Sequence, residues 1–326
     1  MFKNNRLVFI LAGGIAFAAV PLLTAAQNYP SRPIRIIAQF TPGTSTDILA
    51  RVIGQKLTEA WGQPVVIDNR PGAGGIVGTE IGARAAPDGY TLTMGVSSAF
   101  GINPTLYSKL PYDAIRDFAP IANIALTPQT LVTNPSFAAK SVKELVAAAK
   151  AKPGQINFAS LGSGSTSHLT MEMFMSAAGI KLNHIPFKGS PAAHAELMAG
   201  QVPVMFDAIP AVLPHIKSGK LRGLGIGTLH RSPFLPELPT IAESGYPGFE
   251  AVGWIGIVAP VKTPEAILDK LNREILRILQ APDVKERLAT LAFTPVGSTR
   301  KEYAAFIKAE IAKWGKAVKD SGAKAE

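Results

Sequence analysis

The stretch IRIIAQFTPGTSTDILARVI, residues 34–53, contains the unit from which the fold can be predicted. Residues 34–40 form an apolar run typical of a buried strand. A loop rich in small and hydroxyl side chains follows, and from Asp47 to Ala60 the apolar residues recur near helical spacing. A strand, a short loop and a helix in this order indicate an α/β fold.

The same unit recurs along the chain, which supports the α/β class. The sequence predicts strands over 64–69, 90–96, 156–160, 204–208 and 252–260, and helices over 74–85, 168–178, 212–218, 264–280, 282–291 and 300–321. Thr263 is the predicted N-cap of the helix that starts at Pro264. Ser298 or Thr299 is predicted to cap the last helix, with Glu302 within reach as a capping-box acid.

The length and net charge of the chain limit its possible domain organisation and its possible binding partners. A chain of 326 residues exceeds what one hydrophobic core usually serves, so we expect two domains. No repeat or low-complexity linker divides the chain, which favours domains that share strands across a hinge. The formal net charge of +10 suits anionic partners. Nucleic acid is a weaker interpretation, because the lysines and arginines are dispersed and form no arginine-rich run beside aromatics.

The first residues are typical of an export signal. Lys3 and Arg6 precede an apolar run over 7–20, and Ala26 ends a small-residue segment suited to cleavage. We therefore predict a signal peptide over 1–26, with an uncleaved membrane anchor as the alternative. Its removal takes away two of the ten net positive charges. The chain has no cysteine, which excludes disulfides, thiolate metal sites and a lipid-anchored thiol.

Three loops combine glycine with a predicted helix start, and two of them are rich in hydroxyl side chains. They are TPGTSTD (41–47), RPGAGG (70–75) and LGSGSTS (161–167). Glycine permits close approach to a ligand, and the free N–H groups and dipole at a helix start favour an anion. Ordinary turns and N-caps are the alternative, and the second loop is the weakest candidate. Since no P-loop and no complete dinucleotide fingerprint is present, a carboxylate is the expected anion.

Catalytic and metal chemistry find less support. There is no G-x-S-x-G elbow, and the spacing of Ser163, His168 and Asp207 does not require a triad. The five histidines form no close ligand pair, so neither a metal nor another cofactor is predicted. Two alternatives stay open: a secreted hydrolase that uses Ser163 or Ser165 with His168, and a ligand sensor for a membrane signalling protein.

Several short motifs occur in a characteristic order and spacing. They are FTPG (40–43) followed by Thr46-Asp47, NRPGAGG (69–75), APDGYTL (86–92), Asn103-Pro104 with LPYD (110–113), FKG (187–189) and VMFD (204–207). Through them the chain resembles the substrate-binding receptors of tripartite tricarboxylate transporters, also called Bug receptors, over essentially the whole mature region.

The resemblance implies a type II periplasmic-binding-protein fold: two α/β lobes joined by two crossing strands, with a ligand cleft between them. The lobes would comprise residues 28–126 plus 252–326 and residues 127–251. The resemblance also implies a monomeric periplasmic receptor without enzymatic activity. Such a receptor captures a small carboxylate, an aromatic or dicarboxylic acid included, and delivers it to an integral-membrane permease.

In that family the first loop holds water that bridges a ligand carboxylate, and the loop of the other lobe contacts it directly. The resemblance therefore implies ligand-binding roles for Gly43, Thr44, Ser45, Thr46, Asp47, Ser98, Ser163, Ser165, Thr166 and Asp207. Thr44 stands where the family commonly has glycine, and Phe100 where histidine is frequent. These departures predict a pocket for an aromatic or larger acid. Trp254 and Phe100 are each expected either in the core or in the wall of the cleft.

Overall fold

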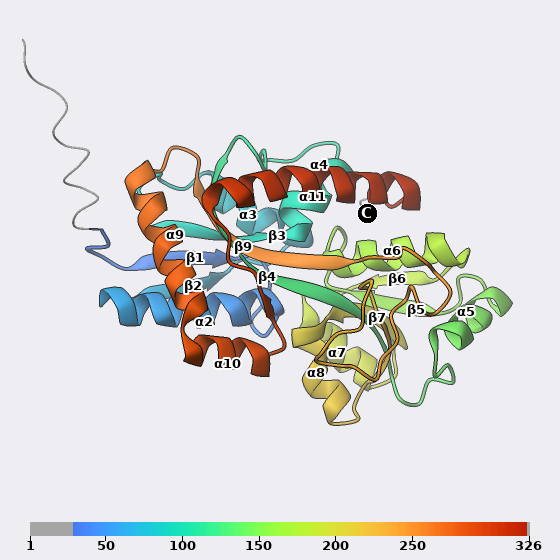
Figure 1. The fold of residues 1–326 in the computed structure, drawn as a ribbon. Coiled ribbons are helices and arrows are strands. Elements are labelled where there is room, and N and C mark those ends of the chain that lie inside the picture. Colours follow the sequence, from blue (N-terminus) through green and yellow to red (C-terminus); the bar gives the residue numbers. More distant parts are fainter. Residues whose placement is uncertain (1–28, 325–326) are drawn as a thin grey trace, which may run out of the picture.

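The computed structural model describes residues 29–324, so the predicted signal peptide lies outside the described residues. Figure 1 shows an elongated molecule in which two groups of strands and helices lie side by side. The first lobe begins with these elements: β1 (Ile34–Ala38), α2 (Ser45–Trp61), β2 (Val65–Asn69), the 3-10 turn η1 (Ala73–Gly75), α3 (Ile76–Ala83), β3 (Thr91–Val96), the π-helical turn η2 (Ser98–Ile102) and α4 (Asn103–Leu106).

The chain then passes through the second lobe and returns. The second lobe follows the long strand β4 (Phe118–Thr133) and contains α5 (Val142–Ala151), β5 (Asn157–Ser160), α6 (Thr166–Ala178), β6 (Asn183–Pro186), α7 (Ser190–Met198), β7 (Val204–Ala208), α8 (Ile209–Lys217) and β8 (Arg222–Ile226). The return consists of β9 (Val252–Pro260), α9 (Glu265–Gln280), α10 (Pro282–Thr290), β10 (Thr294–Pro295) and α11 (Arg300–Ser321).

The strands form one sheet path in the order β2-β1-β3-β9-β4-β7-β5-β6, with β8 and β10 also paired to β4. Within each lobe the neighbours β1, β2 and β3, or β5, β6 and β7, run parallel, as expected where helices connect successive strands. The carboxyl ends of parallel strands are where an open α/β sheet binds ligands.

Two long strands join the lobes. β4 pairs with β9 from Phe118 to Pro128, and from Gln129 to Thr133 it pairs with β7 and β8 of the second lobe. The change of partner occurs directly after Pro128, whose nitrogen has no hydrogen to donate to a ladder. Figure 1 shows both strands running from one lobe into the other. The structure thus has the predicted arrangement of two α/β lobes joined by crossing strands.

Helix α11 extends over both lobes (Figure 1). Its Tyr303 and Ile307 belong to the apolar core of the first lobe. Its Trp314 and Val318 instead pack in a cluster with second-lobe residues such as Phe174. Within residues 29–324, none of the helices has both the length and the apolar content needed to span a membrane.

The predicted elements are present, but several helix starts differ from the prediction: α6 begins at Thr166 and α8 at Ile209, two and three residues before the predicted starts. The strand over 252–260 and the helix over 300–321 have the predicted bounds, and Thr299 forms a full capping box with Glu302. Thr263, however, is not the N-cap of α9. Pro264 has extended backbone angles and occupies that position, so the helix starts one residue later than the Thr263 cap requires.

Candidate functional site

A small cavity of about 50 Å³ lies between the two lobes. It is lined by Phe40, Thr44, Ser45, Thr46, Val96, Ser97, Ser98, Thr127, Gln129, Leu161, Ser165, Thr166, Ser167, Asp207, Ala208, Trp254 and Ile255. These residues come from the starts of α2 and α6, the ends of β3 and β7, and both crossing strands. Seven of the predicted binding residues are therefore together: Thr44, Ser45, Thr46, Ser98, Ser165, Thr166 and Asp207.

The first loop presents the N-terminus of α2 to this cavity. Thr44 is the N-cap: its hydroxyl donates to the carbonyl of Thr41 at 3.0 Å and accepts from the amide of Asp47 at 3.4 Å. The first-turn N–H groups of Ser45 and Thr46 have no carbonyl within the helix to bond. The buried hydroxyl of Ser45 has no hydrogen-bond partner among the described residues. This end of α2 therefore offers several donors at once.

Asp47 and Gly43 support this loop from behind and do not line the cavity. The Asp47 carboxylate accepts from the Gly43 amide, from the Asn69 side chain and from Arg51 Nε, each at 3.0 Å. Burial alone would raise the pKa of Asp47, but these hydrogen bonds and the Arg51 charge outweigh burial and lower that pKa. The two residues fix the loop geometry, which is a different role from ligand contact.

The third loop presents the N-terminus of α6 from the opposite lobe. Ser165 is its N-cap and accepts from the amide of His168 at 3.2 Å. Thr166 Oγ1 lies 2.8 Å from Ser97 Oγ of the first lobe, so a hydrogen bond crosses the cleft. The hydroxyl of Ser167, the last residue of this loop, donates to the carbonyl of Phe206. Thus the two lobes contact each other at the cavity.

Asp207, at the end of β7, is the only charged residue that lines the cavity among the described residues. Its Oδ2 lies 3.0 Å from His194 Nε2, and its Oδ1 accepts from the Ala208 amide at 2.7 Å. Both side chains are buried, so this pair is shielded from solvent. Helix α8 begins at Ile209, directly after the strand, and is the third helix whose start faces the cleft.

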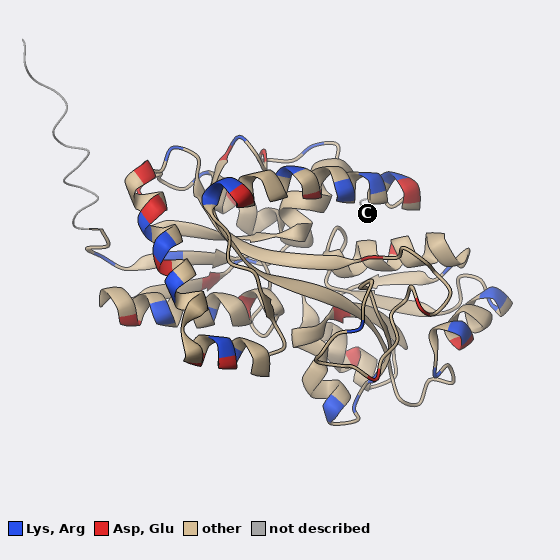
Figure 2. Cartoon of the chain, in the orientation of Figure 1, with Lys and Arg blue, Asp and Glu red and all other residues tan. Residues whose placement is uncertain are grey.

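Further lining atoms are buried without a partner. Ser98 Oγ and Gln129 Oε1 have no hydrogen-bond partner among residues 29–324. Buried polar atoms are nearly always bonded, so such a group of unpaired atoms in one cavity indicates a polar ligand. No lysine or arginine of the described residues lines it, and Figure 2 shows these cations spread over the outer helices and loops. Three helix N-termini and several hydroxyls would thus hold an anion here.

A larger cavity of about 620 Å³ adjoins the first and shares Phe40 and Leu161 with it. The second glycine loop, the weakest candidate in the sequence, lines this cavity together with Ser163 and the exposed Lys188. Ser163 thus lies outside the small cavity, and its carbonyl accepts from the Tyr107 hydroxyl at 3.3 Å. The two cavities together extend from the helix starts to the rim of the cleft.

The residues of a hydrolase triad do not assemble. His168 Nδ1 accepts from the amide of Gly164 at 3.3 Å, and its Nε2 lies 3.5 Å from Glu172. Asp207 pairs with His194 and not with His168. Ser165 Oγ is occupied as an N-cap. In the part of the chain that the structure describes, no group of His, Asp or Glu side chains is placed to hold a metal ion.

The two aromatic residues that were candidates for the wall of the cleft have different positions from each other. Phe100 is buried in the first lobe, with its ring centroid 4.9 Å from that of Phe118, and it lines neither cavity. The expected aromatic wall from Phe100 is therefore absent. Trp254 combines both of its expected roles: it lines the small cavity, and its indole nitrogen donates to the buried Glu310 at 2.9 Å.

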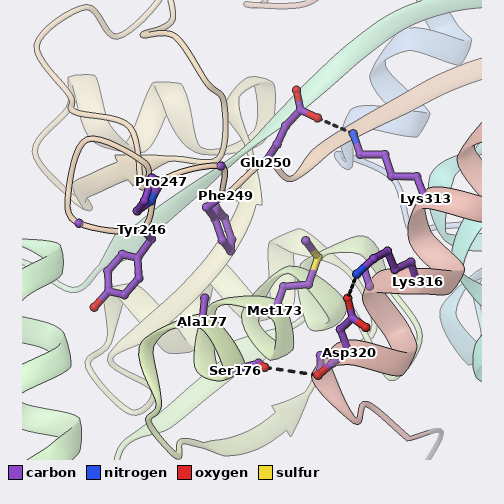
Figure 3. Close-up of a pocket in the computed structure, with 14 residues that line it drawn as sticks. Met173, Ser176, Ala177, Tyr246, Pro247, Phe249, Glu250, Lys313, Lys316 and Asp320 are labelled. Atoms are coloured by element: carbon purple, nitrogen blue, oxygen red, sulfur yellow. Dashed lines mark hydrogen bonds and ion pairs between the residues drawn. The ribbon is translucent and has the colours of Figure 1, made fainter.

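A separate groove of about 580 Å³ lies between α6, the loop over 245–250 and α11 (Figure 3). Tyr246, Phe249 and Met173 give it an apolar floor. Its charged groups are already paired, as Lys313 with Glu250 at 2.6 Å shows. The groove lies at the C-terminal parts of α6 and α11, where the helix dipole disfavours an anion. The cleft between the lobes is therefore the better carboxylate site.

Comparison with known families agrees with this geometry. Residues 49–323 match the model of the tripartite tricarboxylate transporter family receptor. The chain is 42% identical over 321 residues to Protein BugT of Bordetella pertussis (strain Tohama I), and the match covers 98% of each chain.

Solved structures share the whole architecture. R. palustris Rpa4515, solved with adipate, matches with a TM-score of 0.88 and 34% identity over 90% of this chain and 98% of that one. The periplasmic binding protein BugD matches with a TM-score of 0.87 and 34% identity over 91% and 99%. These similarities confirm the predicted binding-protein fold with two α/β lobes.

Proposed function

The chain belongs to the tripartite tricarboxylate transporter receptor family, whose members are solute-binding receptors and not enzymes, and we propose that it captures a small carboxylated solute between its lobes. The observation that carries the proposal is the meeting of three helix N-termini, from both lobes, at one cavity; among residues 29–324, the Ser45 and Ser98 hydroxyls there have no partner and no lysine or arginine lines it. Such a site stabilises a carboxylate through amide and hydroxyl donors. The adipate held by the related Rpa4515 supports a carboxylated ligand.

The proposed ligand contacts divide by lobe. Ser45, Thr46 and Ser98 would contact the carboxylate from the first lobe, and Thr166 from the second. Thr44 and Ser165 would act mainly as N-caps that keep the two helix starts in position. Gly43 and Asp47 would hold the first loop, while Ser163 would line the path toward the rim.

The two adjoining cavities together leave room for an acid with an extended carbon chain. The cavity at the helix starts is small, and a ligand longer than the carboxylate end would pass Phe40 and Leu161 into the larger cavity. That path favours dicarboxylic acids or acids with an extended substituent. A requirement for an aromatic ring has less support, because Phe100 lies in the core.

Capture would proceed by closure of the lobes around the ligand. We propose lobes of residues 28–126 plus 252–326 and residues 127–251; the first boundary lies two residues before β4 changes its partner after Pro128, and the second lies at the start of β9. The cross-cleft hydrogen bonds from Ser97 to Thr166 and from Tyr107 to Ser163 would stabilise such a closed arrangement. A ligand that contacts both lobes favours this arrangement by its higher affinity for it.

Delivery completes the proposed role. The family consists of receptors of a transporter, and its relative BugD is a periplasmic binding protein. We propose that the signal over 1–26 exports the chain to the periplasm, where it acts as a monomer. It would hand its ligand to the integral-membrane subunits of the transporter.

A thermal-shift screen of the mature chain tests carboxylate capture. A ligand at about 100 times its dissociation constant adds roughly 2.7 kcal/mol to the free energy of unfolding, which corresponds to a rise of several degrees. We expect such a rise with at least one mono-, di- or tricarboxylate and none with its neutral amide analogue. A rise with neutral solutes and none with any acid would contradict the proposal.

A further inference from the structure

Two histidine rings lie next to the third loop and line neither cavity of the cleft. His168 is in the first turn of α6 and is only 3% exposed, and the half-buried His184 is on β6. Their rings stack with centroids 4.1 Å apart and 10° between the planes. Phe158 of the second-lobe core packs against His184 with ring centroids 4.8 Å apart. Two titratable side chains are therefore stacked face to face beside that core.

Both rings are connected to backbone amides of the third loop. The Gly164 amide donates to Nδ1 of His168 at 3.3 Å. The Gly162 amide donates to the Ser160 hydroxyl at 3.1 Å, and that hydroxyl lies 2.6 Å from Nε2 of His184. Gly162 and Gly164 have φ values of 107° and 77°, a backbone conformation that other residues rarely adopt. The two histidines therefore help to hold an unusual backbone path.

The Gly164 amide fixes the charge state of His168 in this arrangement. A backbone N–H can only donate, so Nδ1 must offer a lone pair, and the ring is a neutral imidazole with its proton on Nε2. Nε2 lies 3.5 Å from Oε1 of Glu172, one turn further along α6. The Glu172 carboxylate favours a positive charge on the ring, but a second proton would have to enter at Nδ1, where it would face the N–H of Gly164.

The charges on the other elements packed against α6 are engaged elsewhere. β5 and η2 carry no charged side chain. α11 carries Lys313, Lys316 and Asp320, which are all ion-paired in the groove over the C-terminal part of α6. On β7 the Asp207 carboxylate is bonded to a histidine of α7. A proton on His184 would place a second positive charge 4.1 Å from the first and would oppose it.

The backbone that these rings hold is also where the third loop meets the first lobe. A Cβ at Gly164 would lie 2.8 Å from Oδ1 of Asn103 and 3.0 Å from Cε2 of Tyr107, so the first lobe is packed directly against it. Ser165 and Thr166 follow at once and line the small cavity. A change at Gly164 would therefore alter both the contact between the lobes and the helix start that faces the proposed anion.

We propose that His168 and His184 form a pH-sensitive support of the third loop: the neutral rings hold the loop in the form that meets the first lobe, and protonation of His168 releases it. A histidine ordinarily titrates at about pH 6.5. The held loop requires a neutral ring and so binds fewer protons than the released loop, which means that it gains stability as the pH rises. Below about pH 6, capture of an acid should weaken. This effect on capture rests on the proposed function, whereas the change in the loop does not.

NMR spectroscopy of the mature chain without an added acid tests the switch itself. At about pH 8, nitrogen-15 spectra of the rings should show His168 with its proton on Nε2 alone. On titration to about pH 5, the protection of the Gly164 amide from hydrogen exchange should fall at least about tenfold, with the midpoint of the His168 ring. A ring protonated on Nδ1 at pH 8, or a Gly164 amide that does not respond as the ring titrates, overturns the proposal.

Two variants assign the response to His168. In His168→Asn, the side-chain oxygen can accept from Gly164 in place of Nδ1 and does not titrate, so the amide should stay protected across the pH range. His168→Phe keeps a ring in the stack without an acceptor, so protection should be low throughout. The matched control is His230→Asn, a change at an exposed histidine after β8, which should respond as the parent does. A response that persists in His168→Asn overturns the assignment.

Isothermal titration at about pH 7.5 and 5.5 extends the test to capture. The probe is adipate, the acid held by the related Rpa4515, or the strongest acid of the thermal-shift screen if adipate does not bind. Protonation of the acid affects both proteins alike, so the ratio of the parent affinity to that of His168→Asn isolates the histidine. This ratio should fall at least about fivefold at the lower pH, since each pH unit below the titration point reduces the neutral ring about tenfold.

The results for capture and for the loop are distinguishable. A ratio that does not change with pH overturns the effect on capture. Failure of every acid to bind at both pH values contradicts the proposed function, and the NMR titration then decides the switch alone.

Discussion

Asp47 illustrates how a residue can matter for binding without contacting the ligand. Three donors converge on its buried carboxylate, and two of them come from the loop residue Gly43 and from Asn69 at the end of β2. Its pKa is lowered because these bonds and the Arg51 charge outweigh the effect of burial. The ionised form therefore stabilises the folded state and with it the start of α2.

The lowered pKa of Asp47 gives a pH dependence with a definite sign. The carboxyl of the unfolded chain has an ordinary pKa of 3.8, so its contribution to stability is complete above that pH and is lost as the pH falls through the lower folded pKa. We expect Asp47→Asn to reduce the free energy of unfolding by about 1 to 3 kcal/mol at pH 7, as for bonds to a charged group. Below pH 3.8 the deficit should shrink.

Urea unfolding at pH 7 and pH 3 measures this difference. Asp88→Asn is the control, because its ion pair with Arg32 is solvent-exposed and should contribute little. A deficit of Asp47→Asn that stays constant between the two pH values would show that the carboxylate is not held in its charged form.

The sequence predicted residue types well and residue roles less well. The loop pattern identified Thr44, Ser45 and Thr46, since glycine and hydroxyls before a helix are visible without a structure. It missed Gln129, which reaches the cavity from the crossing strand β4 and belongs to no local motif. Whether a loop residue faces the ligand or supports the loop depends on neighbours such as Asn69, which are distant in sequence.

At the scale of elements, two N-cap serines allow the effect of a cap on protein stability to be distinguished from its effect on ligand binding. Ser165 caps α6 at the cavity, and Ser141 caps α5, accepting from the amide of Glu144 at 3.2 Å, and does not line the cavity. We expect Ser165→Ala and Ser141→Ala each to lower the free energy of unfolding by about 1 kcal/mol. Only Ser165→Ala should also weaken ligand binding, since it loosens donors that face the cleft.

Chemical denaturation and titration with the best acid of the screen measure both quantities. The proposed role of the α6 N-terminus would be wrong if the two variants bound the acid equally well. It would also be wrong if Ser165→Ala bound as tightly as the parent chain.

The element that the sequence least revealed is β4. It contains Pro120 and Pro128, and proline in a run argues against a central strand. In the structure the ladder shifts its register after Pro120 and changes its partner strand after Pro128, so both prolines stand at irregularities. Strong local patterns, as in α11 and β9, were by contrast read with the correct bounds. The point at which β4 changes its paired strand depends on tertiary contacts, so it leaves no periodic pattern in the sequence.

At the scale of the whole molecule, closure depends on close backbone approach between loops of the two lobes. A Cβ at Gly74 would lie 2.5 Å from the carbonyl oxygen of Ser163, which is closer than such atoms can come. Gly154 has a similar positive φ, but a Cβ there would meet nothing within 4 Å. The two positions thus share backbone strain and differ in the steric barrier to closure.

We expect Gly74→Ala to weaken binding of the best acid at least about tenfold, because the clash acts only on the closed state that the ligand favours. Gly154→Ala should keep the parental affinity, although both variants should be somewhat less stable, by about 1 kcal/mol. Isothermal titration compares the affinities. Unchanged binding by Gly74→Ala would mean that ligand capture does not need this closure.

A crystal structure of the mature chain with the most stabilising acid tests carboxylate capture between the lobes most directly. We expect a carboxylate among Ser45, Ser98 and Thr166, within hydrogen-bond distance of the first-turn amides of α2 and α6. An acid bound instead in the groove beside Tyr246 and Lys313 (Figure 3), with the cleft between the lobes occupied only by solvent, would contradict it.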